Sequence, residues 1–199
     1  MSGLGGLHIG VKIVARNPCP EHGIVHMESD ACQKGFVGEN YKEYDMGLRG
    51  FSAMLIANVF KTATTADIKD TSNVSQTITA NSAVTTCQLV AGAGVTAPVF
   101  SNYDVQSTGI AGDPTFDGNS PITATVNNTI TDNSSNGTFT ITGTFTNNYA
   151  GNETYGNIGI YITNSVSTFM MAHDQTNGGS GYVVSHLGTV AVTYTITVS

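Results

Sequence analysis

The chain has 199 residues, of which 40% are hydrophobic and 11% are charged, and its formal net charge is −7. This length is enough for one sizeable core, so we expect a single domain with an appendage rather than two large domains. All seven basic residues precede residue 70, and the stretch 71–199 has no cation to neutralise phosphate, which argues against nucleic acid and anionic membranes as partners.

The N-terminal segment up to Asn17 has no basic start, and glycines and His8 interrupt its apolar positions. We therefore expect neither a secretion signal here nor a membrane span, because no stretch approaches the roughly 18 apolar residues that a span needs. The three cysteines, Cys19, Cys32 and Cys87, are an odd number, which favours reduced thiols in a chain made in the cytosol.

Two short apolar segments, 9–16 and 24–28, flank a turn rich in Pro and Gly, and they predict an N-terminal β-hairpin. The pattern then changes, because apolar residues recur every three or four positions over 44–60. That spacing predicts one amphipathic helix, which two internal glycines weaken and which therefore needs a packing partner. We assign residues 1–70, the hairpin plus the helix, to a docking part.

After residue 70 the apolar period becomes two. Threonines alternate with apolar residues over 138–146 and again over 190–198, as strands with one buried and one wet face require. Weaker strands are predicted at 74–79, 85–90, 122–126, 158–162, 168–172 and 182–185. Many short strands predict a mainly β fold, an antiparallel β-sandwich or jelly-roll-like domain over 71–199, with 101–121 as its longest loop and best candidate contact loop.

One cluster near the N-terminus has zinc-binding residue types, namely Cys19, His22, His26 and Cys32. Its spacing allows three interpretations: a structural zinc site, a Cys19–Cys32 disulfide, or ordinary turn residues. Neither cysteine belongs to a CxxC pair, and Pro18 and Pro20 already account for the turn. We favour the third interpretation and expect no cofactor beyond this zinc candidate.

Other chemical patterns are weaker. The segment 92–97 matches GxGxxA, but Pro98 and β-type sequence follow where a dinucleotide-binding turn needs a helix. Glu153 and Asp174 are candidate paired carboxylates, yet the chain has no Trp to form a glycan platform. The long loop also contains a calcium candidate, formed by Asp113, Asp117 and Asn119. No nucleophile motif accompanies the histidines, so we expect no enzymatic activity.

Three stretches carry a family resemblance. Residues 46–60 match a "G-L-x-x-x-A-x-x-L/F" helix, residues 87–98 match a strand that runs into a Gly turn, and residues 156–198 match a "G-L-F … M-x-A-R/H … L-T-V-T-Y-T-I-T" ending. Together they resemble small β-rich structural proteins of tailed bacteriophage particles or related archaeal viruses. The acid that usually precedes the GLF-like strand is absent at Asn157, and 105–137 matches nothing in the pattern.

The resemblance implies a non-enzymatic virion component of the capsid-decoration, neck, tail or fibre-associated kind. Its implied partners are further copies of itself, with a trimer preferred, and other virion proteins such as the major capsid or tail proteins. Its implied location is the virion, after synthesis in the host cytoplasm. The basic residues of 1–70 would then dock onto a larger acidic partner.

The main alternative is a receptor- or glycan-binding module on a virion or cell surface. In that case, the 101–121 loop would form the contact surface together with four tyrosines, Tyr103, Tyr149, Tyr155 and Tyr161. A subunit of a cell-surface filament built by strand exchange is a third hypothesis, which would require export.

Overall fold

The computed structural model describes residues 7–25, 33–44, 68–77, 84–94, 97, 122–123, 125–132, 137–165 and 167–198. Within them the chain is mainly β, as predicted, and neighbouring strands pair antiparallel. The strands are β1 (Leu7–Arg16), β2 (Phe36–Tyr44), β3 (Ile68–Lys69), β4 (Ser75–Gln76), β5 (Val84–Gly92), β6 (Ile122–Thr123), β7 (Thr125–Asp132), β8 (Gly137–Thr146), β9 (Glu153–Tyr155), β10 (Asn157–Asn164), β11 (Thr168–Gln175), β12 (Tyr182–Val184) and β13 (Thr189–Val198). Two short 3₁₀ turns complete the set, η1 (Gln33–Gly35) and η2 (Asn177–Gly179).

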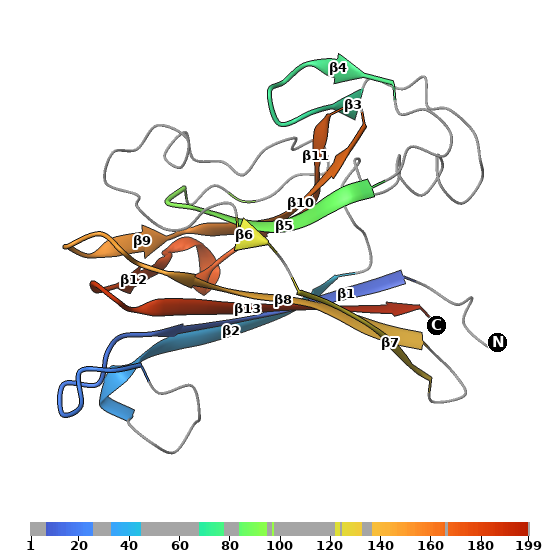
Figure 1. Cartoon of the computed structure of the whole chain (residues 1–199). Helices are drawn as coiled ribbons and strands as arrows, with labels where there is room; N and C mark the ends of the chain where they lie inside the picture. The colour runs from blue at the N-terminus through green and yellow to red at the C-terminus, as the bar shows by residue number, and fades with distance from the viewer. Residues whose placement is uncertain are drawn as a thin grey trace.

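Two larger sheets form the body of the molecule (Figure 1). The five-stranded sheet has the order β2-β1-β13-β8-β7, and the four-stranded sheet has the order β11-β10-β5-β6. Two short pairs, β12-β9 and β3-β4, complete the described strands. Because β1 pairs along its length with β13, the predicted boundary at residue 70 does not separate the two sheets.

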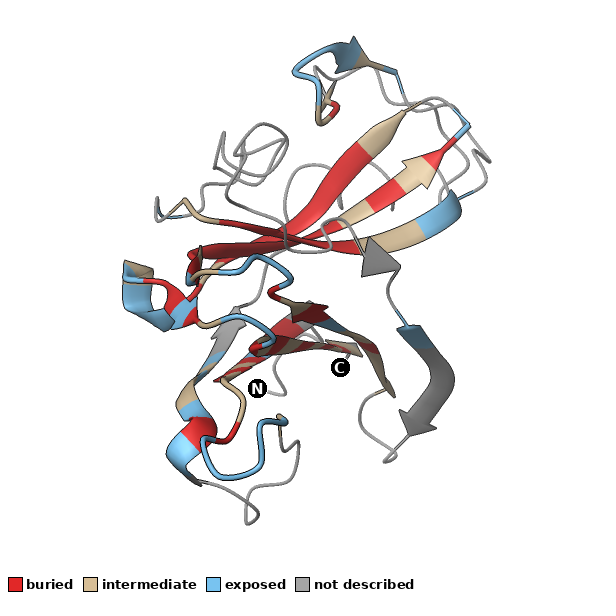
Figure 2. Ribbon diagram, turned by 60° about the vertical axis from the view of Figure 1, so that its left-hand side comes forward, coloured by how far each residue is buried: buried red, intermediate tan, exposed pale blue. Residues whose placement is uncertain are grey.

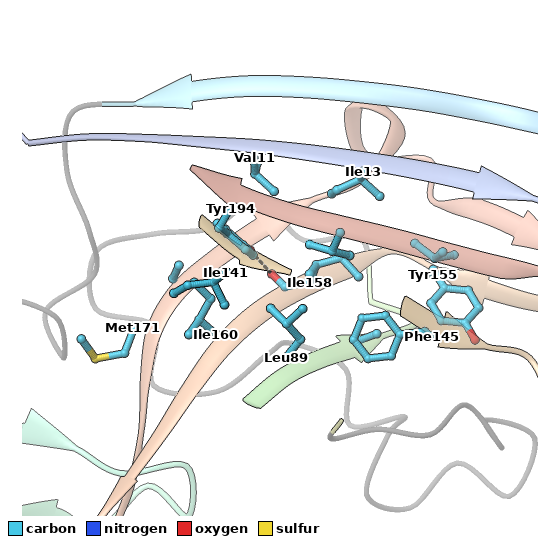
Figure 3. Close-up of a cluster of buried hydrophobic side chains, with 14 of the residues drawn as sticks. Val11, Ile13, Leu89, Ile141, Phe145, Tyr155, Ile158, Ile160, Met171 and Tyr194 are labelled. Atoms are coloured by element: carbon cyan, nitrogen blue, oxygen red, sulfur yellow. Dashed lines mark hydrogen bonds between the residues drawn. The ribbon is translucent and has the colours of Figure 1, made fainter. Parts of the chain in front are cut away.

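One hydrophobic core draws on the inner faces of both sheets. The apolar members of the alternating strands, such as Val192 and Ile141, point inward from the five-stranded sheet, and Leu89 and Ile160 meet them from the four-stranded sheet. Figure 3 shows these side chains facing one another, and Figure 2 shows that buried residues follow the strands of both sheets. The alternation of Thr with apolar residues forms strands β8 and β13 because each has one face to bury.

A polar contact also links the two sheets inside this core. The Tyr194 hydroxyl of β13 donates a hydrogen bond to Oδ2 of Asp174 in β11 at 2.9 Å, and both residues are fully buried. Buried polar groups need such partners, since leaving one without a partner costs about 1–3 kcal/mol. Asp174 therefore has a structural contact across the core.

The predicted hairpin is wrong in its second strand. Ile24 and Val25 are outside any strand, and β1 pairs instead with β2 across the connection 17–35. The amphipathic helix predicted over 44–60 receives no support, because Tyr44 ends strand β2 opposite Ile9 and residues 45–60 lie outside the described residues. Cross-strand pairing wins at Tyr44 over the helical spacing. The described residues contain no α-helix.

Candidate contact surface

Three connections meet at one end of the five-stranded sheet, on the left of Figure 1. We call this end the loop end, and it comprises residues 17–25, 33–36, 147–151 and 185–188. Asn17, which directly follows β1, links two of its parts: its backbone N–H donates to the Gly35 carbonyl at 2.7 Å, and its Oδ1 accepts from the Ser185 N–H at 2.7 Å. A single side chain therefore joins segments far apart in sequence.

Asn147 is the second link, and it is fully buried where β8 ends. Its Nδ2 donates to the Gly151 and Val184 carbonyls, each at 2.9 Å, and its Oδ1 accepts from the Tyr149 N–H at 2.8 Å. Its backbone N–H also donates to the Gly188 carbonyl at 2.8 Å. An amide side chain that uses both its donor and its acceptor capacity holds the connecting loops in one arrangement.

Exposed apolar side chains gather on this frame. They are Ile24, Phe36, Tyr149 and Leu187. Apolar residues scattered singly over a surface need no explanation, but a group of them rimmed by polar residues is typical of a protein–protein contact. Because backbone hydrogen bonds already fix the loops, a partner would bind here without the entropic cost of ordering them.

Leu187 has an unfavourable backbone conformation for an exposed leucine. It lies in a turn closed by the hydrogen bond from the Gly188 N–H to the Ser185 carbonyl at 2.8 Å, and its φ is +60°. Glycine or asparagine normally occupies this left-handed turn position, because a Cβ there costs about 1–2 kcal/mol. The side chain is still 48% exposed, so local burial does not explain why leucine stands here.

The basic residues expected to dock onto an acidic partner have contacts within the chain. Lys34 pairs with Glu21, Lys12 pairs with Glu39 at 3.0 Å, and the Arg16 guanidinium lies 5.4 Å from the centre of the Phe36 ring. Such compensation leaves little net positive field at the loop end. Contact through the apolar residues is better supported by this geometry than contact through charge.

The zinc candidate is only partly within the described residues. Cys19 is buried and disulfide-bonded, and an oxidised sulfur is not a zinc ligand, so a zinc ion at Cys19 would require its reduced form. His22 lies in the turn that follows, where its N–H donates to the Cys19 carbonyl at 3.1 Å. His26 and Cys32 lie outside the described residues, as does the disulfide partner of Cys19. The four-residue zinc site therefore stays a prediction.

Elsewhere in the described part of the chain, no group of three or more His, Cys, Asp or Glu side chains is placed to hold a metal. Cys87 is a free cysteine in β5, and burial raises the pKa of its thiol. The calcium candidate of the 101–121 loop lies outside the described residues.

The paired-carboxylate hypothesis meets two structural residues. Glu153 is buried in β9, where it accepts a long hydrogen bond from the Tyr155 hydroxyl at 3.4 Å. Burial, together with the nearby Glu153 carboxylate, raises the pKa of Tyr155 well above its usual range. Asp174 contacts Tyr194 in the core, as described above.

The glycine motif at 92–97 has a packing role in the structure. The Gly156 N–H donates to the Gly92 carbonyl at 2.6 Å, and a Cβ on Gly156 would collide with the Gly94 carbonyl. Glycine at position 156 thus permits two backbone segments to approach closely.

The four tyrosines of the glycan hypothesis do not gather on one surface. Tyr155 is fully buried in the core, Tyr161 packs against Val90 and Met170, and Tyr149 is exposed at the loop end. Tyr103 lies outside the described residues. Sequence reasoning missed Asn17, Asn147 and Leu187. The only signals for them were the turn-forming Asn and Gly residues near the strand ends.

No protein-family model, curated protein or solved structure matches this chain. Among the described residues, no helix has the length and apolar character needed to cross a bilayer.

Proposed function

We propose that this chain is a non-enzymatic structural component of a virus particle, a capsid-decoration or neck-, tail- or fibre-associated protein. Its two sheets would form an antiparallel, jelly-roll-like β-sandwich. The observation that carries the proposal is the loop end, where four exposed apolar side chains stand on a frame fixed by Asn17 and Asn147. The sequence resemblance to tailed-phage structural proteins supports the particle as the setting.

The loop end favours a protein partner over a small ligand. Its apolar residues come from three separate connections and are held by backbone hydrogen bonds, which is the arrangement of a docking patch. The implied partner is a larger virion protein, such as the major capsid or tail protein. Since the charges nearby are compensated within the chain, its binding depends on apolar burial and little on ionic strength.

The test is co-sedimentation with virus particles assembled without this chain. The wild-type protein adds to them in a fixed copy number, and retention changes little as salt is raised. The Leu187→Asp variant weakens retention by about tenfold or more, because it places a charge in the centre of the patch. Aspartate tolerates the left-handed turn better than leucine does, so the fold survives.

Val84→Asp is the matched control, because Val84 has the same 48% exposure but lies at the start of β5, outside the loop end. This variant should bind like the wild type. A protein that ignores the particles but binds cells or glycans would overturn the proposal in favour of the receptor- or glycan-binding alternative. Equal losses for both variants would remove the loop end as the docking surface.

A further inference from the structure

The outward face of the five-stranded sheet is free of charge along its two longest neighbouring strands. The outward positions of β8 and β13 hold nine threonines and one alanine, and all of them are at least partly exposed. These residues are Thr138, Thr140, Thr142, Thr144, Thr146, Thr189, Ala191, Thr193, Thr195 and Thr197. We call this set the threonine face.

Register makes the threonine face regular. Thr142 lies opposite Thr193, Thr140 opposite Thr195, and the hydroxyls of Thr138 and Thr197 are 3.1 Å apart. The row continues into β7, because Thr125 pairs with Thr142. Neighbouring strands stand about 4.8 Å apart and alternate residues about 6.7 Å apart, so methyl and hydroxyl groups repeat over a nearly planar surface.

The absence of charge on this face is unusual for a surface that faces only water. Soluble domains carry charged residues at about 25–35% of surface positions, so ten outward positions would ordinarily include about three. The same sheet carries charge next to this face, since Lys12 of β1 pairs with Glu39 of β2. Depletion of Lys, Glu and Asp at the centre with charge at the margin is the composition of a protein interface.

The size of the face also fits an interface. Five strands at about 4.8 Å spacing and about 33 Å length span roughly 800 Å², which is the area that each partner contributes to a stable complex of standard size. Two β-sheets pack face to face at about 10 Å with their strands within about 30° of each other.

We propose that the threonine face binds the same face of a second copy of this chain. It rests on the proposed function in one respect, that the chain is part of an assembly. Threonine hydroxyls donate and accept, so two such faces satisfy each other, whereas a charged partner would lose water without gaining an opposite charge. Contact of the face with itself makes the interface isologous, so the two copies are related by a twofold axis.

The experiment measures mass by light scattering after size exclusion, over a range of protein concentrations. The wild-type chain is a dimer or a multiple of it. The double variant Thr142→Lys/Thr193→Lys has a dissociation constant at least about tenfold higher, because it brings like charges together across the interface. The matching Thr142→Glu/Thr193→Glu variant behaves the same, and mixing the Lys and Glu proteins restores the dimer.

The matched control is Thr86→Lys, since Thr86 is an exposed strand threonine of the four-stranded sheet. It assembles like the wild type, and circular dichroism of all variants verifies that they fold. Restored pairing in the Lys–Glu mixture also excludes misfolding as the cause. A monomeric wild-type chain, or double variants that still assemble, would overturn the proposal.

Particle binding separates this proposal from the proposed function. If the threonine variants are monomeric and still add to particles through the loop end, both proposals hold. If a wild-type dimer ignores particles, the proposed function fails and the self-contact stands. If the wild-type chain is monomeric and the threonine variants lose particle binding, the face contacts another virion protein, which overturns the second copy as its occupant.

Discussion

The two sheets share one core but differ on their outward faces. In the four-stranded sheet, Val90 and Met170 are almost fully buried on the side away from the core, where they form a second apolar cluster with Tyr161. His173, opposite Gly159 on the same side, is buried as well. In the five-stranded sheet, the corresponding side is the partly exposed threonine face.

The difference teaches how each sheet is stabilised. Strands buried on both faces gain from two sets of apolar contacts and lose the alternation of polar and apolar residues, as β11 does with its run Phe169–Asp174. Strands with one wet face are stabilised from one side and keep the other available for a partner. The five-stranded sheet is therefore the one suited to assembly, and the four-stranded sheet is interior-like.

The largest effect expected from this comparison is at Met170. Met170→Ala should lower the free energy of unfolding by about 2–5 kcal/mol, as for a core residue, although its side chain points away from the shared core. Thr193→Ala at an outward position of β13 should change it by less than about 0.5 kcal/mol. Urea unfolding of dilute protein measures both, and a cost for Met170→Ala as small as that for Thr193→Ala would remove the distinction between the faces.

The same distinction explains what the sequence could predict. Strands β8 and β13 follow from period-two alternation, because one wet and one buried face impose it on residues such as Phe145 and Tyr194. Strand β10, buried on both sides over Asn157–Ile160, lacks that alternation and gives a weaker signal. The helical spacing that includes Tyr44 was misleading, because one residue of a spaced set fits a strand pairing equally well.

The candidate site was less predictable than the fold. Asn17 and Ser185 are 168 positions apart in sequence, and no local pattern indicates that they join. Leu187 has an ordinary residue type for a strand approach, and its positive φ follows from the turn geometry and from its hydrogen bond to the Asn147 carbonyl. Turn residues can indicate that a loop exists, but not which loops meet or which side chain they expose.

A smaller effect is expected at Asp70, which attaches the β3-β4 hairpin to the turn between β10 and β11. Burial acts to raise the pKa of Asp70, but hydrogen bonds from Ser167, Val74, Gln76 and Ser72 favour the carboxylate and together lower the pKa. A lowered folded-state pKa contributes stability that is present above the ordinary value of 3.8 and is lost as pH falls through the folded value.

Asp70→Asn should therefore cost about 1–3 kcal/mol at neutral pH, and the difference from the wild type should shrink as the solution is acidified below the ordinary carboxyl pKa. Thermal unfolding at a series of pH values measures it. Glu39→Gln, which removes an exposed ion pair from the five-stranded sheet, is the control and should cost less than about 1 kcal/mol. A pH-independent cost at Asp70 would mean that packing, not the charged hydrogen bonds, holds the hairpin.

The smallest expected effect compares two threonine pairs, one on each sheet. The hydroxyls of Thr138 and Thr197 are 3.1 Å apart on the five-stranded sheet, and those of Thr163 and Thr168 are 2.9 Å apart on the four-stranded sheet. Double-mutant cycles with valine should give a coupling of about 0.2–1 kcal/mol for each pair in dilute protein, since both are cross-strand hydroxyl contacts. As protein concentration rises, stability conferred by the threonine face becomes linked to association, so the Thr138–Thr197 cycle should change and the Thr163–Thr168 cycle should not. Two cycles that respond to concentration alike would mean that the outward faces do not differ in their capacity to bind a partner.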